Sequence, residues 1–406
     1  MSDTLRLLTG EDAGPLLAAA VETAGGRLVR WQATQVDHRP GRSTTVAYSA
    51  LVRWADRDQQ ETLAASAGIP TDRDRPGVLV LSDGATEVAV WRFPQDPGLP
   101  ALEAACDPAA VLELLRRLGL ARTTTAEQLT LRTRAYRPRR RAVIEASVPQ
   151  ARLFLKVGRP DRVADLHRRH RVLRDAGVPV PEPLGWTDDG LLVLQALPGR
   201  GLRSALRREG AAAVRAEDLI ATLDALPAEL LDLPARASWS DGAAHYARVV
   251  ADALPDQADR VHALAGAVQD GLADSDEPLV PVHGDFYEAQ LFAARGRLTG
   301  VLDVDSAGPG RRGDDLGCLL AHVEVLAQIH TADADRLRGA VRTWLPVLDG
   351  DRSTDPRSLR LRTAGVLISL ATGPHRVQQA GWQQATRQRL DLVDRWLEAA
   401  RTGAGV

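Results

Sequence analysis

The sequence predicts an α+β protein, with strands concentrated in the first half of its 406 residues and helices in the second. Segments in which apolar and polar residues alternate, a pattern typical of strands, recur between residues 44 and 197. From Pro198 onward the apolar residues recur at helical spacing instead, as in the series Val261, Leu264, Val268 and Leu272.

The first 120 residues contain both kinds of element. Residues 11–24 have a helical pattern, and residues 44–54 and 86–93 alternate as strands do. Residues 108–119 form an expected helix with a proline in its first turn. We therefore expect a separate N-terminal α+β domain over residues 1–120.

A second strand-rich section follows, and we expect it to form a domain over residues 121–197. Its expected elements are, in chain order, strands at 129–136, 142–148 and 152–157, a helix at 161–175 and a strand at 191–197. The remainder, residues 198–406, is expected to be a helical domain.

Composition excludes several classes of partner. The chain has 51 Lys and Arg against 53 Asp and Glu, and no long stretch carries one sign, which argues against nucleic acid or a membrane surface as a partner. No run of about 18 apolar residues is present, and the first residues do not resemble a signal peptide, so we expect a cytoplasmic protein. Two cysteines, Cys106 and Cys318, are too few for a disulfide framework or a zinc site.

The chain contains a single lysine, Lys156, among its 51 basic residues. It ends the apolar strand Leu153–Val157. A lysine at a strand end is usually no more than a solvated charge. Its isolation among arginines instead indicates a role that a planar guanidinium cannot fill, such as a compact positive charge on phosphate.

One local pattern carries the strongest chemical signal. Asp285 follows His283 and Gly284, Gln290 comes five residues later, and Asp303 follows an apolar strand. Phosphoryl transfer requires a carboxylate that orients and deprotonates the attacking hydroxyl, and a divalent cation that bridges the phosphates. A carboxylate on a tight turn, an amide and a second carboxylate would supply these parts.

This pattern resembles the H-x-D-x-x-x-x-N catalytic loop and the metal-binding segment of the protein-kinase-like superfamily, in particular its aminoglycoside phosphotransferase and choline kinase branch. The resemblance implies a bilobal fold with a small β-rich N-lobe and a helical C-lobe. It also implies that Asp285 is the catalytic base, that Gln290 and Asp303 bind Mg²⁺, and that ATP is the phosphoryl donor.

The same resemblance extends to the strand-rich section. It implies that Lys156 binds the nucleotide phosphates and that backbone groups near Gln195 and Leu197 contact the nucleotide base. A P-loop kinase is excluded, because no G-x-x-x-x-G-K-[ST] sequence is present.

Three positions depart from the superfamily pattern. Gln290 stands where most kinases have asparagine. The maltokinases and glucosamine kinases that this sequence resembles also have glutamine there. The helix at 161–175 has no glutamate to pair with the lysine. Arg169 lies near the position where this acid is expected, and Asp165, one turn earlier, is the best substitute for it. The loop Arg137–Arg141 contains no glycine, so its arginines either contact phosphate or remain solvated.

The sequence says least about which molecule accepts the phosphoryl group. Residues 1–120 resemble the N-terminal cap domain of maltokinase-like proteins, which favours a sugar, an amino sugar or an aminoglycoside as the small-molecule hydroxyl acceptor. Glu288 and Trp382 are candidates for binding it, although Trp382 is equally a candidate core or interface aromatic. The alternative function is a nucleotide-binding pseudokinase that acts on a protein partner.

Overall fold

The structure, a computed structural model, describes residues 3–403, which form two compact units. The first unit consists of the chain up to His167 together with Pro183–Ala196 and His375–Ala380, and the second of Arg168–Glu182, Leu197–Pro374 and the chain from Gly381 onward. This division does not separate residues 1–120 from 121–197, so that boundary stays a prediction.

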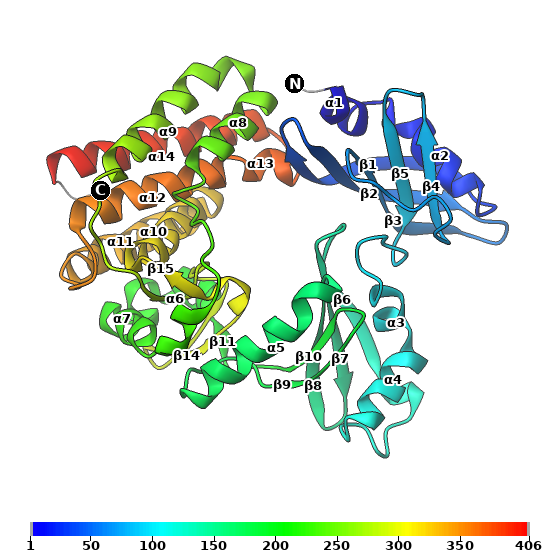
Figure 1. Ribbon diagram of the computed structural model, residues 1–406, viewed down its shortest axis with the longest axis horizontal. Coiled ribbons are helices and arrows are strands. Elements are labelled where there is room, and N and C mark those ends of the chain that lie inside the picture. Colours follow the sequence, from blue (N-terminus) through cyan, green and yellow to red (C-terminus); the bar gives the residue numbers. More distant parts are fainter. Residues whose placement is uncertain (1–2, 404–406) are drawn as a thin grey trace. The chain divides into compact units, whose positions relative to one another are not determined.

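The first unit opens with a five-stranded antiparallel sheet in the order β1-β2-β3-β5-β4. Its elements and the two helices before it are α1 (Asp3–Thr9), α2 (Ala13–Glu22), β1 (Arg27–Arg39), β2 (Ser43–Arg53), β3 (Asp58–Ala67), β4 (Val78–Ser82) and β5 (Glu87–Arg92). Alternate residues of β2, including Val46 and Tyr48, are fully buried against α1 and α2. The hydroxyl of Tyr48 donates to the Leu8 carbonyl at 2.6 Å, which joins α1 to the sheet. Figure 1 shows α1 and α2 beside the strands of this sheet.

A second five-stranded antiparallel sheet has the order β6-β7-β8-β10-β9. Its strands and flanking helices are α3 (Leu102–Cys106), α4 (Pro108–Arg117), β6 (Thr130–Arg137), β7 (Arg141–Val148), β8 (Ala151–Val157), α5 (Pro160–Asp175), β9 (Pro183–Thr187) and β10 (Leu191–Gln195). Leu112 and Leu115 of α4 share one core with Ile144 and Leu155 of this sheet. Helix α4, which the sequence analysis assigned to the N-terminal domain, therefore packs on the second sheet, because its apolar face is buried there.

The N-terminal section is fastened to the β6–β7 turn by Asp96, which is 1% exposed. One of its carboxylate oxygens accepts from the Tyr136 hydroxyl at 2.8 Å and from the backbone N–H of Arg139 at 2.7 Å. Arg139 has a left-handed backbone with φ of 58°. A side chain at Gly98 would lie 2.8 Å from the Arg139 Cα, so the two segments approach as closely as only glycine permits.

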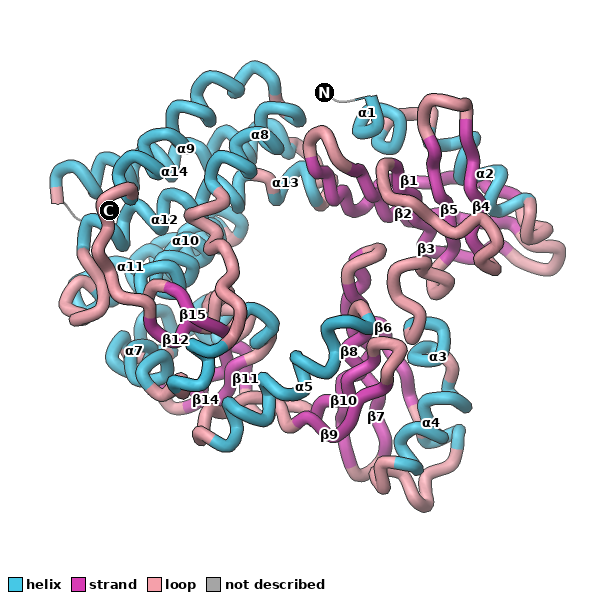
Figure 2. The backbone as a smooth tube through the Cα atoms, in the orientation of Figure 1, coloured by secondary structure: helices cyan, strands magenta, loops and turns pink. Residues whose placement is uncertain are grey.

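The second unit is mainly helical (Figure 2). Its helices are α6 (Leu202–Glu209), α7 (Ala216–Asp224), α8 (Ala243–Ala253), α9 (Ala258–Leu272), α10 (Arg312–Ile329), α11 (Ala334–Leu348), α12 (Pro356–Ala371) and α14 (Trp382–Thr402), and the short α13 (Gly373–Arg376) spans the border between the two units. Helix α12 is buried around nearly its whole circumference and contacts α9, α10 and α14. It is the central helix of this unit, as a helix that is buried on all sides must be.

Short strands interrupt the helices where the candidate site lies. They are β11 (Arg200–Gly201), β12 (Val280–Val282), β13 (Leu291–Ala294), β14 (Arg297–Val301) and β15 (Gly308–Gly310). Strands β13 and β14 form a short hairpin between Asp285 and Asp303. These short strands are exceptions to the helical pattern expected from Pro198 onward.

Among residues 3–403, no helix is both long enough and apolar enough to cross a bilayer.

Candidate active site

A tight turn directly after β12 carries His283, Gly284 and Asp285. Gly284 has φ of +78°, and a Cβ atom there would lie 2.6 Å from the carbonyl oxygen of Ser306. The turn therefore requires glycine both for its left-handed backbone and for the close approach of the neighbouring chain. This explains why glycine stands between the histidine and the candidate base.

Asp315 holds the same turn from the first turn of α10. Its two carboxylate oxygens accept from the backbone N–H groups of His283 at 2.7 Å and Gly284 at 2.8 Å. Burial raises the pKa of the Asp315 carboxyl to about 7, against the lowering effect of these two hydrogen bonds. Asp315 thus positions the turn.

The buried imidazole of His283 joins the turn to the segment before Asp303. Its Nδ1 accepts from the backbone N–H of Asp285 at 3.3 Å, and its Nε2 lies 2.8 Å from the carbonyl oxygen of Leu302. An N–H can only donate and a carbonyl can only accept, so the proton belongs on Nε2. Burial lowers the pKa of His283, in keeping with a neutral ring that orients two segments.

Gln290 and Asp303 lie side by side. The amide nitrogen of Gln290 is 3.2 Å from Oδ2 of Asp303, and its backbone carbonyl accepts from Leu302 N–H at 2.7 Å. Asp303 has a left-handed backbone with φ of 57° and precedes a short 3₁₀ helix, Val304–Ser306. A non-glycine residue held in this region is more common at functional sites than elsewhere.

Tyr287 completes this cluster. Its hydroxyl accepts from the Gln290 amide at 3.2 Å, and its ring stacks on His322 of α10 at a centroid distance of 3.9 Å. Burial raises the pKa of the Tyr287 hydroxyl to about 12, with Asp285 as the largest charge that adds to the effect. The hydroxyl is therefore a neutral donor and acceptor at ordinary pH.

Glu288, a candidate acceptor-binding residue, is fully buried. Its Oε1 accepts from Nε of Arg203 at 2.8 Å, and the backbone carbonyl of Glu288 accepts from Arg203 N–H at 3.1 Å. Burial raises the pKa of the Glu288 carboxyl, and the charge of Arg203 opposes that effect. The buried Glu288 side chain joins α6 to the segment after Asp285, and a role for it in binding the acceptor stays a prediction.

Sequence reasoning missed one neighbour of the candidate base. The indole N–H of Trp239 donates to Oδ1 of Asp285 at 3.2 Å. Trp239 lies 46 residues before Asp285, in the turn before α8, and no local pattern connects the two.

The candidate nucleotide-binding residues lie on the second sheet of the first unit and just beyond it. Lys156 is on the central strand β8, between Val143 of β7 and Leu192 of β10. That register puts Lys156 at the end of the β7–β8 ladder nearest the β6–β7 turn. Gln195 is the exposed last residue of β10, and Leu197 is the first residue after the chain enters the second unit.

Two further expectations concern helix residues. Arg169, at the position where an acid was expected on α5, is 3% exposed and donates to the backbone carbonyl of Ala307. The α5 position is thus occupied by a cation bound to the segment after Asp303, and Asp165 as the substitute acid stays a prediction. Trp382 is the first residue of α14 and is partly exposed.

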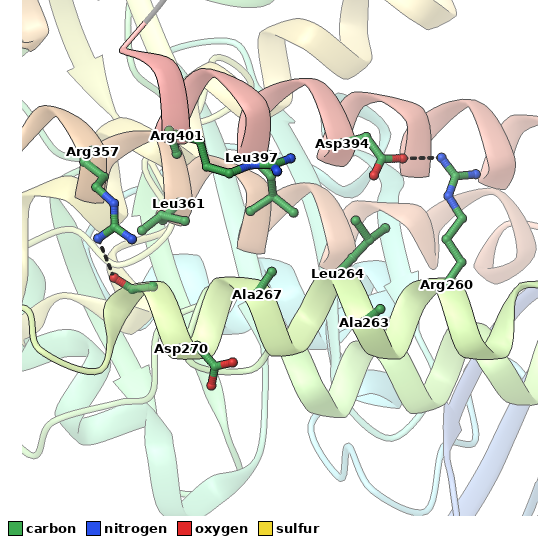
Figure 3. Close-up of a pocket in the computed structure, with 12 residues that line it drawn as sticks. Arg260, Ala263, Leu264, Ala267, Asp270, Arg357, Leu361, Asp394, Leu397 and Arg401 are labelled. Atoms are coloured by element: carbon green, nitrogen blue, oxygen red, sulfur yellow. Dashed lines mark hydrogen bonds and ion pairs between the residues drawn. The ribbon is translucent and has the colours of Figure 1, made fainter.

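A groove of about 550 Å³ lies elsewhere in the second unit, between α9, α12 and α14 (Figure 3). Its floor is apolar, with Leu264 and Leu397, and charged residues lie at its rim, where Arg260 pairs with Asp394. None of its lining residues belongs to the turn or the hairpin described above.

The turn, the buried histidine and the amide beside a carboxylate are groups of the kinds that phosphoryl transfer uses. The sequence profile of the phosphotransferase enzyme family matches residues 128–347. The match covers more than half of the chain, and the chain belongs to this family.

Several solved structures are similar to this chain. The macrolide 2′-phosphotransferase MphH from Brachybacterium faecium is 20% identical, with a TM-score of 0.41, and the alignment covers 70% of this chain and 97% of that one. A thermostable mutant of aminoglycoside phosphotransferase APH(4)-Ia is 19% identical, with a TM-score of 0.47 and coverage of 72% and 99%. A choline/ethanolamine kinase family protein from Mesorhizobium loti is 19% identical, with a TM-score of 0.46 and coverage of 68% and 93%. No sequence among the curated proteins matches the chain.

Proposed function

We propose that this phosphotransferase moves the γ-phosphoryl group of ATP onto a hydroxyl of a sugar, an amino sugar or an aminoglycoside, with Mg²⁺ as cofactor. The observation that carries the proposal is the His283 imidazole, which binds the backbone of Asp285 on one side and of Leu302 on the other. It fixes the candidate base and the candidate metal ligand relative to each other. Such fixed positioning is what phosphoryl transfer needs most from a protein.

The residues present fit a magnesium ion. Asp303 offers a carboxylate and Gln290 an amide beside it, and Mg²⁺ usually takes one or two protein oxygens with the rest of its ligands from phosphates and water. Gln290 would present its oxygen to the metal after its amide turned over. The bound ion would neutralise charge that develops on the phosphates.

Each remaining residue has an assigned task. Asp285 accepts the proton of the acceptor hydroxyl as that oxygen attacks the γ-phosphorus. Lys156 binds the phosphates as a compact ammonium, and backbone groups near Gln195 and Leu197 bind the nucleotide base. In this assignment residues 121–197, with α4 packed on their sheet, act as the N-lobe and residues 198–406 as the helical C-lobe. The rest of residues 1–120 act as a cap. Family membership supports this enzymatic role over the alternative of a pseudokinase.

The test is a screen for ADP release in which purified protein, ATP and Mg²⁺ are incubated with monosaccharides, disaccharides, amino sugars and aminoglycosides. We expect ADP release above the acceptor-free rate with at least one of these, and its loss in Asp285→Asn. Release that is absent with every compound, or unchanged in Asp285→Asn, would contradict the proposal.

A further inference from the structure

A small aromatic cluster lies beside the candidate base. The ring centroids of Trp239 and Tyr246 are 5.8 Å apart with an interplanar angle of 33°, and the ring of His245 meets Tyr246 edge-on at 5.1 Å. All three side chains are partly exposed. By contrast, Trp344 and Trp396 are fully buried in the helical core. Aromatic rings that stay partly exposed next to a functional carboxylate are available to a ligand.

The turn that carries Trp239 is held rigidly. Ser238 N–H donates to the Asp241 carboxylate at 3.0 Å, and Asp241 N–H donates back to the Ser238 hydroxyl at 3.1 Å. The hydroxyl of Ser240 donates to Asp314 at 2.6 Å, and Asp314 is paired with the buried Arg362 at 2.9 Å.

The consecutive residues Asp314 and Asp315 therefore bind the Trp239 turn and the Asp285 turn, respectively. Asp314 holds the turn of Trp239, and Asp315 holds the turn of Asp285, both from the first turn of α10. The 3.2 Å hydrogen bond from the Trp239 indole to Asp285 then joins the two turns directly. The indole face and the candidate base are held in a fixed relation, which is the property of a built binding site.

We infer that Trp239 and Tyr246 form the platform on which the acceptor lies, and that the acceptor is a neutral saccharide whose ring packs its C–H face on the indole. The inference rests on the proposed function and narrows its acceptor class. An aromatic face attracts the apolar face of a sugar through dispersion, while the ring hydroxyls stay at the edge, where Asp285 can reach one of them.

The charges nearby favour a neutral ring over a polycation. The carboxylate of Glu288 is paired with Arg203, and that of Asp241 is used within its own turn. Arg236, three residues before Trp239, places its guanidinium 3.4 Å from the Ser306 hydroxyl. A positive charge close to the Trp239 turn disfavours an acceptor that carries several ammonium groups.

The Trp239 indole has a second task. Its N–H fixes the orientation of the Asp285 carboxylate, so that Trp239 is both a contact for the acceptor and a positioning residue for the base. Tyr246 contributes its ring to the platform beside the Trp239 indole.

The experiment compares Trp239→Phe, Trp239→Ala and Tyr246→Ala with the wild type in the ADP-release assay, with glucose and maltose as neutral probes and glucosamine and hygromycin B as cationic ones. Trp186→Ala is the control, because Trp186 is a 40% exposed tryptophan on β9 of the first unit. Melting temperatures report whether each variant folds.

We expect a higher kcat/KM of the wild type for a neutral probe than for either cationic one. Tyr246→Ala should raise the sugar KM by about tenfold, the upper range for one lost aromatic contact, and leave the KM for ATP unchanged. Trp239→Phe should lower kcat more than it raises the sugar KM. Trp239→Ala should both lower kcat and raise the sugar KM, and Trp186→Ala should change neither kcat nor the sugar KM.

A preference of the wild type for cationic acceptors would overturn the inference, as would a sugar KM that Tyr246→Ala and Trp239→Phe leave unchanged. Equal changes in the KM for sugar and for ATP would also overturn it. These results leave the kinase activity itself intact. If the wild type releases no ADP with any of the four probes, the proposed function and the inference fail together.

Discussion

The side-chain amide of Gln290 lies 3.2 Å from Oδ2 of Asp303, across the hairpin formed by β13 and β14. The two residues are 13 positions apart in sequence, and the hairpin turns the chain back so that they meet. The Tyr287 hydroxyl accepts from the same amide. If the amide turned over, its oxygen would lie beside the Asp303 carboxylate, where the two could share a cation.

The first prediction follows from this pair. Gln290→Ala should raise the Mg²⁺ concentration needed for half-maximal activity on the order of tenfold, the scale of lost contacts around a metal. Gln290→Asn should show a smaller increase, because the shorter amide keeps an oxygen but not its reach. Magnesium titrations of ADP release measure both, with the partly exposed Gln328→Ala as control. An unchanged titration for Gln290→Ala would remove Gln290 from the metal site.

The second prediction concerns pH. The folded-state pKa of Asp315 is about 7, well above the usual value near 3.9 of an aspartate in an unfolded chain. Between roughly pH 4 and 7 the folded protein therefore binds a proton that the unfolded chain has released, so this group makes the free energy of unfolding fall as pH rises through that window.

Asp315→Asn should remove this contribution. The difference in unfolding free energy between wild type and variant should be largest near pH 4 and should shrink toward pH 7. Denaturant unfolding at several pH values measures it, with Asp161→Asn, which alters an exposed ion pair with Arg159, as control. A difference that stays constant across the window would show that Asp315 is not protonated in the folded protein.

The sequence predicted those features of the site that depend on short separations along the chain. Asp285, Gln290 and Asp303 share one turn and one hairpin, and a local motif can specify such an arrangement. Trp239 is 46 residues from Asp285, and this contact arises from the packing of the turn before α8, which no local pattern encodes.

The fold shows the same division. The strands expected at 142–148 and 152–157 lie within one residue of β7 and β8, because their apolar residues alternate clearly. Strands β1 and β3 were missed, since their exposed halves are polar and weaken the alternation. The contact of Asp96 with Arg139 joins residues 43 positions apart, so only the tertiary structure reveals it.

The third prediction uses the single lysine. Lys156→Arg keeps the charge but replaces a compact ammonium with a larger planar group, so turnover should fall on the order of 10²-fold, the cost of a small misplacement of a reacting group. The melting temperature of Lys156→Arg should equal that of the wild type. Steady-state kinetics with ATP measure this, and Arg152→Lys on the same strand is the matched control. If Lys156→Arg turns over at nearly the wild-type rate, Lys156 is only a solvated charge at the end of a strand and does not bind phosphate.

The fourth prediction concerns Asp96, which joins the N-terminal section to the β6–β7 turn. Burial raises the pKa of its carboxyl, and its oxygens accept from Tyr136, Arg139 and Gly98. Asp96→Asn replaces one acceptor oxygen by a donor that faces N–H groups, which should cost about 1–3 kcal/mol of unfolding free energy.

Because the turn lies at the Lys156 end of the sheet, Asp96→Asn should also raise the KM for ATP. The control is Asp37→Asn, which removes the more exposed ion pair with Arg140 and should cost about 0–1 kcal/mol. Chemical denaturation and ATP kinetics test both variants. Equal losses of stability in the two variants would count against Asp96 as the main fastening.

The most direct test of the central assignment separates the two aspartates. Asp285 is assigned to the acceptor hydroxyl, so Asp285→Asn should bind Mg·ATP with nearly wild-type affinity while its turnover falls by roughly 10²–10⁴, the usual contribution of a general base. Asp303 is assigned to the metal, so Asp303→Asn should weaken nucleotide binding as well as turnover. The measurement is calorimetric titration of both variants with ATP, with and without Mg²⁺. The account predicts that Mg²⁺-dependent binding survives in Asp285→Asn and is lost in Asp303→Asn, and the reverse result would contradict it.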